Sequence, residues 1–359
     1  MYAHAYSARM AASPTPVPAF DATRRWLDPA FFDFWATRLN PLWTWDRPRA
    51  RLLARRPEGE GAVTLLLQAN RHWRGVAPGQ HVELGVQLQG TWLRRHYSPT
   101  RVGPGQFEIT VKAMAGGRVS PHLAQHARVG EVFELGQGFG DFRWPAGQAP
   151  VLLLAAGAGI TPMRALLRAH AERGFDRDVT LMYWTRRRQD ACFAQELRAL
   201  AEAHPRLRVQ LHVTGEGAAR VDALGAAQPL FEGAQVLACG PGGFVQAARA
   251  RWQAHVAGFQ AEAFSAPAQT LAEDGEVDVV LARSGRTLRL PRAVSLLEGL
   301  EAHGLKPRHG CRMGICNTCV CQRQSGATRH LLSGQRHDEP AAPVRLCVQA
   351  PSTDLILEL

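Results

Sequence analysis

Hydrophobic and polar residues form short strand-like runs over residues 48–146. The segments 62–69 (AVTLLLQA), 81–88 (HVELGVQL) and 106–113 (QFEITVKA) are rich in residues that favour strands, and turns containing Gly and Pro separate them. Several short strands with such turns between them are typical of all-β folds. The pattern predicts an antiparallel β-barrel over this part of the chain.

The pattern changes over residues 148–264, where apolar segments alternate with segments of helical character. The predicted strands are 151–156, 179–185, 208–214 and 234–240, and the predicted helices are 161–174 and 191–204. Strands that alternate with helices predict a parallel α/β sheet.

Three other segments complete a multidomain organisation. Residues 265–276 predict a linker because they combine Ala, Pro and acidic residues, and residues 277–359 predict a small domain that carries a cysteine cluster. Residues 1–47 form a leader rich in Pro and aromatic residues.

The leader contains one predicted helix. Asp28 and Pro29 suit the N-cap and the first helical position, and Phe31, Trp35 and Leu39 then fall on one stripe of the helix. Such a stripe can insert at a membrane interface or dock on a partner, and it can also pack on the barrel.

Composition places the chain among globular proteins. It has 359 residues, of which 46% are hydrophobic and 20% charged, and this length allows two or three domains. The longest apolar run, 151–160, is too short to span a membrane, and the N-terminus lacks the features of a secretory signal. A cytoplasmic protein with reduced thiols is therefore expected, in which clustered cysteines indicate a metal or catalytic site.

The formal charge of +11 comes almost entirely from arginines spread along the chain. No helix-turn-helix, RNA-binding signature or zinc-finger His pair accompanies them, so no nucleic-acid partner is expected. The charge suits anionic cofactors, an acidic partner protein or an anionic membrane face.

Four cysteines have the spacing of an iron–sulfur site. Cys311, Cys316 and Cys319 follow the pattern C-x4-C-x2-C, and Cys347 lies in a later segment. This is the plant-type [2Fe-2S] ligand pattern. Structural zinc and a redox thiol are the alternatives, although zinc ribbons prefer two C-x2-C pairs and one is present here. Cys321 is expected to be a bystander.

A short motif in the predicted barrel suits a flavin. Arg95, Tyr97 and Ser98 form R-x-Y-S, in which the Arg can neutralise a pyrophosphate, the Tyr ring can stack on the flavin and the Ser hydroxyl can reach flavin N5. About 20 residues later, glycines and Ser120 precede a predicted short helix, whose N-terminus suits a phosphate. Ordinary turns are the alternative for both motifs.

Glycine-rich turns in the α/β region suit a dinucleotide. Gly157, Gly159 and Pro162 form G-x-G-x-x-P after the first strand, which departs from the standard G-x-G-x-x-G because Pro takes the third place. Cys239 ends a later strand, where it can touch a nicotinamide or lie buried before a tight turn.

The strand between these turns ends in TRRR. Thr185 and the arginines from Arg186 to Arg188 are expected near the adenosine ribose, where arginines favour a 2′-phosphate and therefore NADPH. A solvated basic loop is the alternative, and it leaves NADH possible.

In this order, the motifs resemble the ferredoxin–NADP reductase superfamily, in the branch with a C-terminal plant-type ferredoxin domain. The resemblance covers residues 48–359 and implies FAD (FMN in some members) in the barrel, NAD(P)H in the α/β domain and a cluster in a C-terminal α+β domain of β-grasp fold. The flavin contacts that it implies are Arg95, Tyr97, Ser98, Gly117 and Ser120. The dinucleotide contacts that it implies are Gly157, Gly159, Thr161, Pro162, Arg186, Cys239, Gly240 and Pro241. Phe264 can lie near the flavin or serve in packing.

Residues 28–45 also resemble the leader of reductases that serve membrane-bound fatty acyl desaturases. This resemblance implies an NADPH-dependent reductase that passes electrons through FAD and the cluster to a membrane diiron desaturase, with a peripheral contact at the inner face of the membrane. The alternatives are the reductase of a soluble ring-hydroxylating or phenylacetyl-CoA-type oxygenase, and a redox sensor without turnover. Ser98 and Cys239 are expected to position the reacting atoms.

Overall fold

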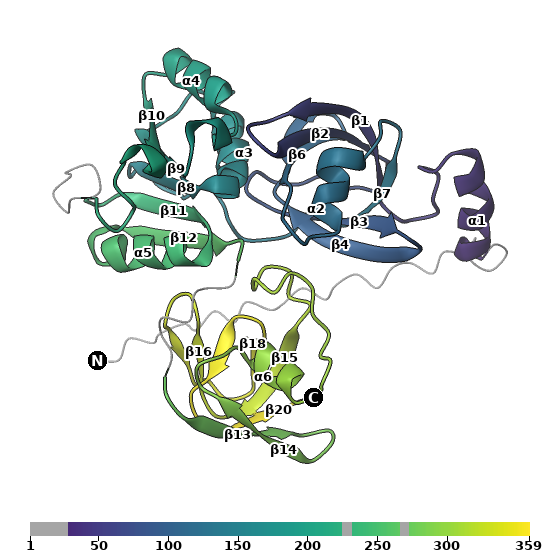
Figure 1. Cartoon of the computed structure of the whole chain (residues 1–359), viewed down its shortest axis with the longest axis vertical. Coiled ribbons are helices and arrows are strands. Elements are labelled where there is room, and N and C mark those ends of the chain that lie inside the picture. The colour runs from purple at the N-terminus through teal and green to yellow at the C-terminus, as the bar shows by residue number, and fades with distance from the viewer. Residues whose placement is uncertain (1–27, 225–231, 266–272) are drawn as a thin grey trace, which may run out of the picture. The chain divides into compact units, whose positions relative to one another are not determined.

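The computed structural model describes residues 28–224, 232–265 and 273–359, and it forms two compact units, Met1–Asp46 and Arg47–Leu359 (Figure 1). Within the described residues, no helix has the length and apolar character needed to cross a bilayer. Residues 1–27 and most of the predicted linker lie outside the described residues.

The first unit contains helix α1 (Pro29–Leu39), which starts as predicted. The Asp28 side chain accepts a hydrogen bond from the Ala30 N–H at 2.8 Å, and Pro29 occupies the first turn, where its missing N–H costs nothing. The buried Asp33 accepts a hydrogen bond from the Trp45 N–H at 2.6 Å, which fixes the segment after the helix.

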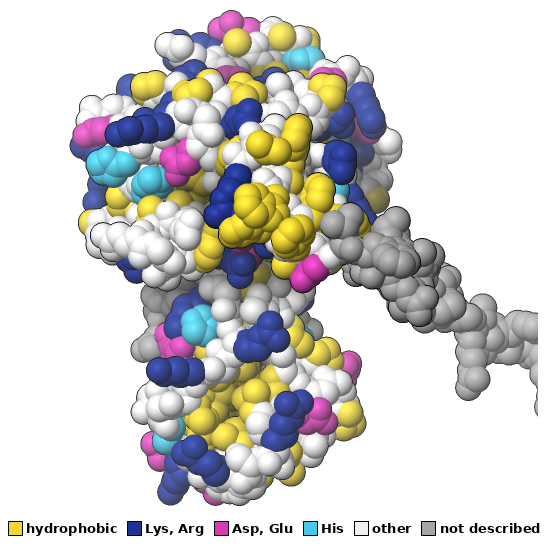
Figure 2. Space-filling view, turned by 90° about the vertical axis from the view of Figure 1, so that its right-hand side faces the viewer, with side chains coloured by type: hydrophobic (Ala, Val, Ile, Leu, Met, Phe, Trp, Pro, Cys, Tyr) yellow, Lys and Arg dark blue, Asp and Glu magenta, His cyan; other side chains and the backbone are white. Residues whose placement is uncertain are grey.

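Large apolar side chains of this unit are exposed to solvent. The exposed set, which Figure 2 shows as a hydrophobic patch over α1, is Phe31, Phe34, Trp35, Leu39 and Trp43. Trp35 is 55% exposed and Leu39 is 81% exposed, so the predicted stripe faces water. Contiguous exposed apolar surface is typical of an interaction site.

Residues 48–146, in which the sequence predicts a flavin and which we call the flavin-type domain, form a seven-stranded antiparallel sheet. Its strand order is β4-β3-β7-β1-β2-β6-β5. The strands are β1 (Arg49–Pro57), β2 (Ala62–Ala69), β3 (Val82–Leu88), β4 (Thr91–Tyr97), β5 (Thr100–Gly103), β6 (Gln106–Lys112) and β7 (Val132–Leu135). The predicted strands and their antiparallel arrangement are confirmed. Alternate residues such as Leu65, Leu67 and Ile109 fill the core, and β4 remains an edge strand.

The next domain is a five-stranded parallel sheet in the order β10-β9-β8-β11-β12. The strands are β8 (Val151–Ala156), β9 (Val179–Thr185), β10 (Leu207–Val213), β11 (Gln235–Gly240) and β12 (Gly258–Ala263), and the helices are α3 (Ile160–Ala171), α4 (Ala194–Ala203) and α5 (Gly242–Trp252). Leu153 and Leu181 pack with α3 and α4, whereas Leu152 and Met182 pack with α5. Helices therefore cover both faces of the sheet, as Figure 1 shows.

The C-terminal domain combines two small sheets with helix α6 (Leu296–Ala302). Its strands are β13 (Glu276–Leu281), β14 (Arg286–Pro291), β15 (Val320–Ser325), β16 (Thr328–His330), β17 (Arg336–His337), β18 (Ala342–Arg345), β19 (Gln349–Pro351) and β20 (Leu355–Leu357). The larger sheet has the order β14-β13-β20-β15-β18, with a parallel pairing between β13 and β20. The Ser295 hydroxyl caps α6 by accepting from the Glu298 N–H at 3.1 Å.

Candidate functional site

The four predicted cluster cysteines lie together at one end of the larger C-terminal sheet. Cys311, Cys316 and Cys319 belong to the loop that leads into β15, and Cys347 follows β18, which pairs with β15. The sulfur atoms of Cys319 and Cys347 are 3.2 Å apart, and the Cys311 N–H donates to the sulfur of Cys316 at 3.3 Å. The thiols thus form two pairs, and each pair can bind one iron of a two-iron cage.

Backbone N–H groups of the loop point at the sulfur atoms. The N–H groups of Met313 and Ile315 donate to the sulfur of Cys311 at 3.3 and 3.4 Å, and the N–H of Gly314 donates to Cys347 at 3.3 Å. Such donors stabilise negative charge on thiolates and sulfides. Within the described residues, no group of three or more His, Cys, Asp or Glu side chains is arranged for a single metal ion.

Left-handed backbone makes the loop tight enough for this arrangement. Arg312 and Asn317 have φ values of 57° and 56°, and Gly314 has φ 75°. A Cβ atom on Gly314 would lie 2.8 Å from the Val348 side chain, so the loop requires glycine there.

Each thiol pair contains one cysteine that ionises readily. In each pair, the hydrogen bond between the two thiols lowers the pKa of one cysteine, Cys316 or Cys319. The same interaction, together with burial, raises the pKa of its partner, Cys311 or Cys347. The thiolate is the form that binds metal. In contrast, burial raises the pKa of Cys321, whose thiol donates to the Gln322 carbonyl at 3.4 Å.

The flavin motif lies at the end of edge strand β4. Arg95 is exposed, and its guanidinium donates to the Arg94 carbonyl at 2.7 Å without an ion pair to any described residue. Tyr97 is half-buried, and burial raises its pKa. Ser98 is buried. A free cation, an aromatic ring and a hydroxyl along one strand end fit a flavin nucleotide.

Ser98 begins a chain of buried polar groups that the sequence did not reveal. Its hydroxyl lies 3.1 Å from Nδ1 of His81, and Nε2 of His81 lies 2.9 Å from both carboxylate oxygens of Glu262. His81 is 2% exposed. The carboxylate accepts a hydrogen bond from Nε2, and Nδ1 shares the second hydrogen bond of the ring with the Ser98 hydroxyl. His81 precedes β3 and Glu262 lies on β12, so the chain joins two domains.

The pairing of β11 with β12 brings Cys239 and Phe264 close to the chain of polar groups formed by Ser98, His81 and Glu262. Cys239 on β11 pairs with Glu262 on β12, and the Phe264 N–H donates to the Gly240 carbonyl at 2.9 Å. The Phe264 ring meets the His81 ring edge-on at 6.4 Å. Cys239 is completely buried, and burial raises its pKa well above the ordinary value.

Gly117 and Ser120 lie in a tight turn before and within the short helix α2 (Val119–Pro121). The Ser120 hydroxyl accepts a hydrogen bond from the Met114 N–H at 3.2 Å, and the Gly117 N–H donates to the Met114 carbonyl at 3.0 Å. Ser120 therefore lies inside the predicted helix rather than before it, and its hydroxyl already braces the turn.

The glycine-rich turn after β8 is closely packed. A Cβ atom on Gly159 would lie 2.0 Å from the Cys239 carbonyl oxygen, whereas Gly157 has φ 54° and open space beside it. The Thr161 hydroxyl donates to the Ala158 carbonyl at 3.0 Å, and Pro162 is the third residue of α3. Pro is tolerated there because first-turn N–H groups have no helical partner.

This turn opens into a pocket of about 700 Å³. It is lined by the carboxyl ends of the parallel strands and by the turn that contains Pro241, the usual position for a ligand in an α/β sheet. The hydroxyl of Thr185 lies buried at its wall without a hydrogen-bond partner among the described residues. A buried unpaired hydroxyl suits a polar ligand.

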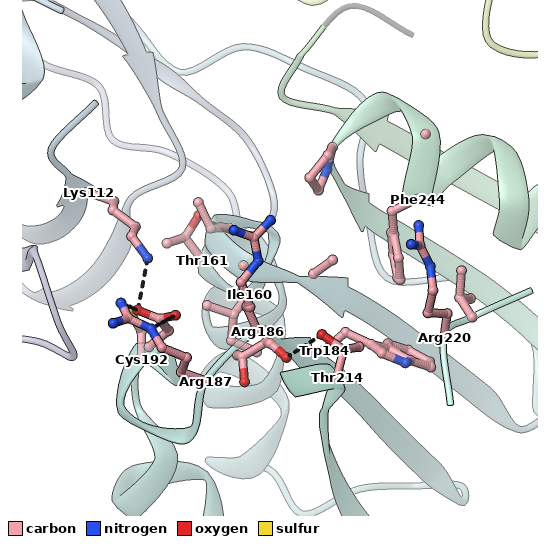
Figure 3. Close-up of a pocket in the computed structure, with 18 of the residues that line it drawn as sticks. Lys112, Ile160, Thr161, Trp184, Arg186, Arg187, Cys192, Thr214, Arg220 and Phe244 are labelled. Carbon is pink, nitrogen blue, oxygen red and sulfur yellow. Dashed lines mark hydrogen bonds and ion pairs between the residues drawn. The ribbon is translucent and has the colours of Figure 1, made fainter. Parts of the chain in front are cut away.

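The basic residues of the pocket are not equivalent (Figure 3). Arg187 lines the pocket and pairs with Asp190 and Glu60 at 3.0 Å. Its neighbour Arg188 does not line the pocket and pairs with Glu216 at 2.7 Å. Arg186 and Arg220 line the pocket without an ion pair to described residues. Figure 3 shows Arg220 beside Phe244, with Arg186 nearer Thr161. Sequence motifs missed Arg220 because it lies on a loop without a recognisable pattern.

Comparisons with known proteins agree with this arrangement. Residues 61–144 match the model described as "Oxidoreductase FAD-binding domain", residues 153–250 match "Oxidoreductase NAD-binding domain" and residues 279–352 match "2Fe-2S iron-sulfur cluster binding domain". An NADPH oxidoreductase of Mycobacterium tuberculosis is 34% identical over 330 residues, which cover 89% of this chain and 86% of the relative. The chain belongs to the ferredoxin reductase family with a C-terminal 2Fe-2S domain.

Other members of the ferredoxin reductase family are also similar. The ferredoxin reductase component of 3-ketosteroid-9-alpha-monooxygenase from Mycobacterium tuberculosis is 30% identical over 303 residues, covering 78% of this chain and 84% of that protein. The solved structure of phthalate dioxygenase reductase shares the fold, with a TM-score of 0.54 and 23% identity over 87% of this chain and 97% of that one. The chain is therefore an oxidoreductase that uses FAD, NAD(P)H and a [2Fe-2S] cluster.

The predicted cluster ligands can be tested by comparing Cys316, a predicted ligand, with Cys321, a predicted bystander. We expect Cys316→Ser to lose the cluster, because one iron would keep a single thiolate, whereas Cys321→Ala keeps it. The readouts are iron and acid-labile sulfide per chain and visible absorbance. Loss of iron from Cys321→Ala with retention in Cys316→Ser would show that the ligand set is different.

Proposed function

We propose that this protein is the NADPH-dependent reductase component of an oxygenase system. The observation that carries the proposal is the presence, in one chain, of a dinucleotide pocket, a flavin motif and paired thiols for a cluster. Relatives support the oxygenase, because they are named as reductase components of 3-ketosteroid-9-alpha-monooxygenase and of glycine betaine monooxygenase, and as one of the subunits of 1,2-phenylacetyl-CoA epoxidase.

When bound, the nicotinamide supplies a hydride, and the flavin and the cluster turn two-electron into one-electron transfer. The protein positions these groups. Ser98 is held by His81, and His81 is held by Glu262, so the hydroxyl has one preferred orientation. Positioning of this kind lowers the entropic part of the activation barrier for hydride transfer, and it requires no acid–base catalysis by the protein. We assign His81 and Glu262 as positioning residues for Ser98.

NADPH is the coenzyme that the pocket favours. Arg186 and Arg220 are the pocket guanidinium groups without carboxylate partners in the described chain, and such groups bind a 2′-phosphate well. Asp222 also lines the pocket, and an acidic residue favours a free 2′-hydroxyl when it lies at the ribose. The relative of 34% identity is named an NADPH oxidoreductase, which supports the same choice.

A membrane-bound desaturase is the second candidate acceptor. The exposed patch on α1 favours it, because amphipathic helices with Trp and Phe on one face bind at membrane interfaces. The named relatives support the oxygenase better.

Two artificial electron acceptors can distinguish reduction of the flavin from electron transfer through the cluster. We expect NADPH with the wild-type protein to reduce ferricyanide, which takes electrons from the flavin, and cytochrome c, which takes them through the cluster. Cys316→Ser should keep the first activity and lose the second. Reduction of neither acceptor by the wild-type protein loaded with both cofactors would contradict the proposal.

The same protein preparation can distinguish the two candidate acceptors, the soluble oxygenase and the membrane-bound desaturase. A Phe31→Ser/Trp35→Ser variant should lose binding to anionic phospholipid vesicles, and electron delivery to a membrane acceptor, only if the desaturase assignment is right. Unchanged delivery to a purified soluble oxygenase favours the oxygenase.

Coenzyme choice should depend on the unpaired arginines. We expect Arg186→Ser and Arg220→Ser each to lower kcat/KM for NADPH about tenfold, or about 1.4 kcal/mol, with little change for NADH. Arg188→Ser is the matched control because its guanidinium pairs with Glu216. Equal losses with both coenzymes would show that these arginines do not read the 2′-phosphate.

The role of His81 can be tested against another histidine that pairs with a glutamate. We expect His81→Ala to slow flavin reduction by NADPH about tenfold at unchanged FAD content and NADPH affinity. His122→Ala is the control, because Nε2 of His122 lies 2.7 Å from Glu131 within the flavin-type domain. Anaerobic stopped-flow absorbance measures the rate, and equal rates in both variants would remove the positioning role.

A further inference from the structure

The C-terminal domain carries positive charge around its cysteine loop. Residues 302–337 contain no Asp or Glu, although they include six Lys and Arg residues. Lys306, Arg308 and Arg312 are exposed, and so is Arg345, which lies two residues before Cys347. We call these four side chains the basic rim.

Hydrogen bonds hold part of the basic rim beside the cluster loop. Nε of Arg345 donates to the Asn317 side chain at 2.6 Å, and Asn317 lies between Cys316 and Cys319. Arg312 follows Cys311 and forms two bonds to Glu301, at 2.6 and 2.9 Å. The rim therefore borders the loop from both of the segments that supply cysteines.

Most of the positive charge of the rim is not neutralised. Glu301 offsets one arginine, while Lys306, Arg308 and Arg345 form no ion pair with described residues. The next carboxylates along the chain, Asp338 and Glu339, interact with the buried Arg323. Val320, next to Cys319, is 44% exposed and provides apolar surface beside the charges.

From these observations we propose that the basic rim is the docking surface for the terminal electron acceptor, and that the acceptor presents an acidic patch there. This inference rests on the proposed function, since it requires a separate protein acceptor. Complementary charge speeds encounter and fixes orientation, whereas an exposed apolar residue beside the cluster permits close contact. Orientation matters because the cluster must come near the acceptor's redox centre.

Another role for the rim makes a different prediction. Thiolates and sulfides outweigh the ferric ions in charge, so basic residues can offset the negative cluster. In that case, removing positive charge would lower the reduction potential of the cluster. Reduction of the cluster within the protein would become slower, whereas its oxidation by an acceptor of either charge would not.

The test uses two arginines of the same domain. Arg308→Glu changes the rim, and Arg286→Glu is the matched control, since Arg286 is exposed, lacks an ion pair with described residues and begins β14 at the opposite edge of the sheet. Three strand spacings separate β14 from β15, about 14 Å, which exceeds the screening length of about 8 Å at physiological ionic strength. Lys306→Glu/Arg308→Glu enlarges the effect.

The probes are the soluble domain of cytochrome b5, which is acidic, and cytochrome c, which is basic. At low salt, we expect the double variant of the full holoprotein to reduce cytochrome b5 about tenfold more slowly and cytochrome c faster, with Arg286→Glu within about twofold of wild type. Added salt should slow the wild-type reaction with cytochrome b5 and remove the difference.

Reduction of the cluster by NADPH, followed without acceptor, is the internal control and should be unchanged in every variant. Equal cytochrome b5 rates in Arg308→Glu and Arg286→Glu, or a slower internal step in the rim variants, would overturn the docking role. Failure of the wild-type protein to reduce its own cluster would instead reject the proposed function.

Discussion

The contact between His81 and Glu262 is the constraint on which the proposed reaction centre depends. It is made by an imidazole of the flavin-type domain and a carboxylate on the last strand of the nucleotide domain, both withdrawn from water. A buried carboxylate without a donor is costly, so the pair favours the arrangement in which the two domains meet. The motif residue Ser98 and the ring of Phe264 take their positions from this contact.

Much of this architecture could be predicted from local sequence. The apolar run at 179–185 predicts the bounds of β9, and the helix of the leader begins where Asp28 and Pro29 predict it. The cysteine spacing indicated four residues that the fold does gather. Each of these signals lies within a short stretch of chain, where turn chemistry, periodicity and ligand spacing act.

The parts that escaped prediction depend on residues far apart in the sequence. His81 and Glu262 are 181 positions apart, and together they form no recognisable sequence motif. The sequence predicts all three arginines from Arg186 to Arg188 near the adenosine ribose. In the structure, Glu60, Asp190 and Glu216 pair with two of them and leave Arg186 without an ion pair to a described residue. Which charges stay free is decided by neighbours that only the tertiary fold brings close.

The nucleotide pocket divides into a part that resists substitution and a part that tolerates it. A Cβ atom on Gly159 would clash with a backbone carbonyl group, so this position excludes every residue except glycine. Arg186 and Arg220 lie on loops after the strands, and both are exposed. If these two arginines read the 2′-phosphate as proposed, natural or laboratory selection can change the coenzyme preference at two exposed side chains while the glycine-rich turn stays the same.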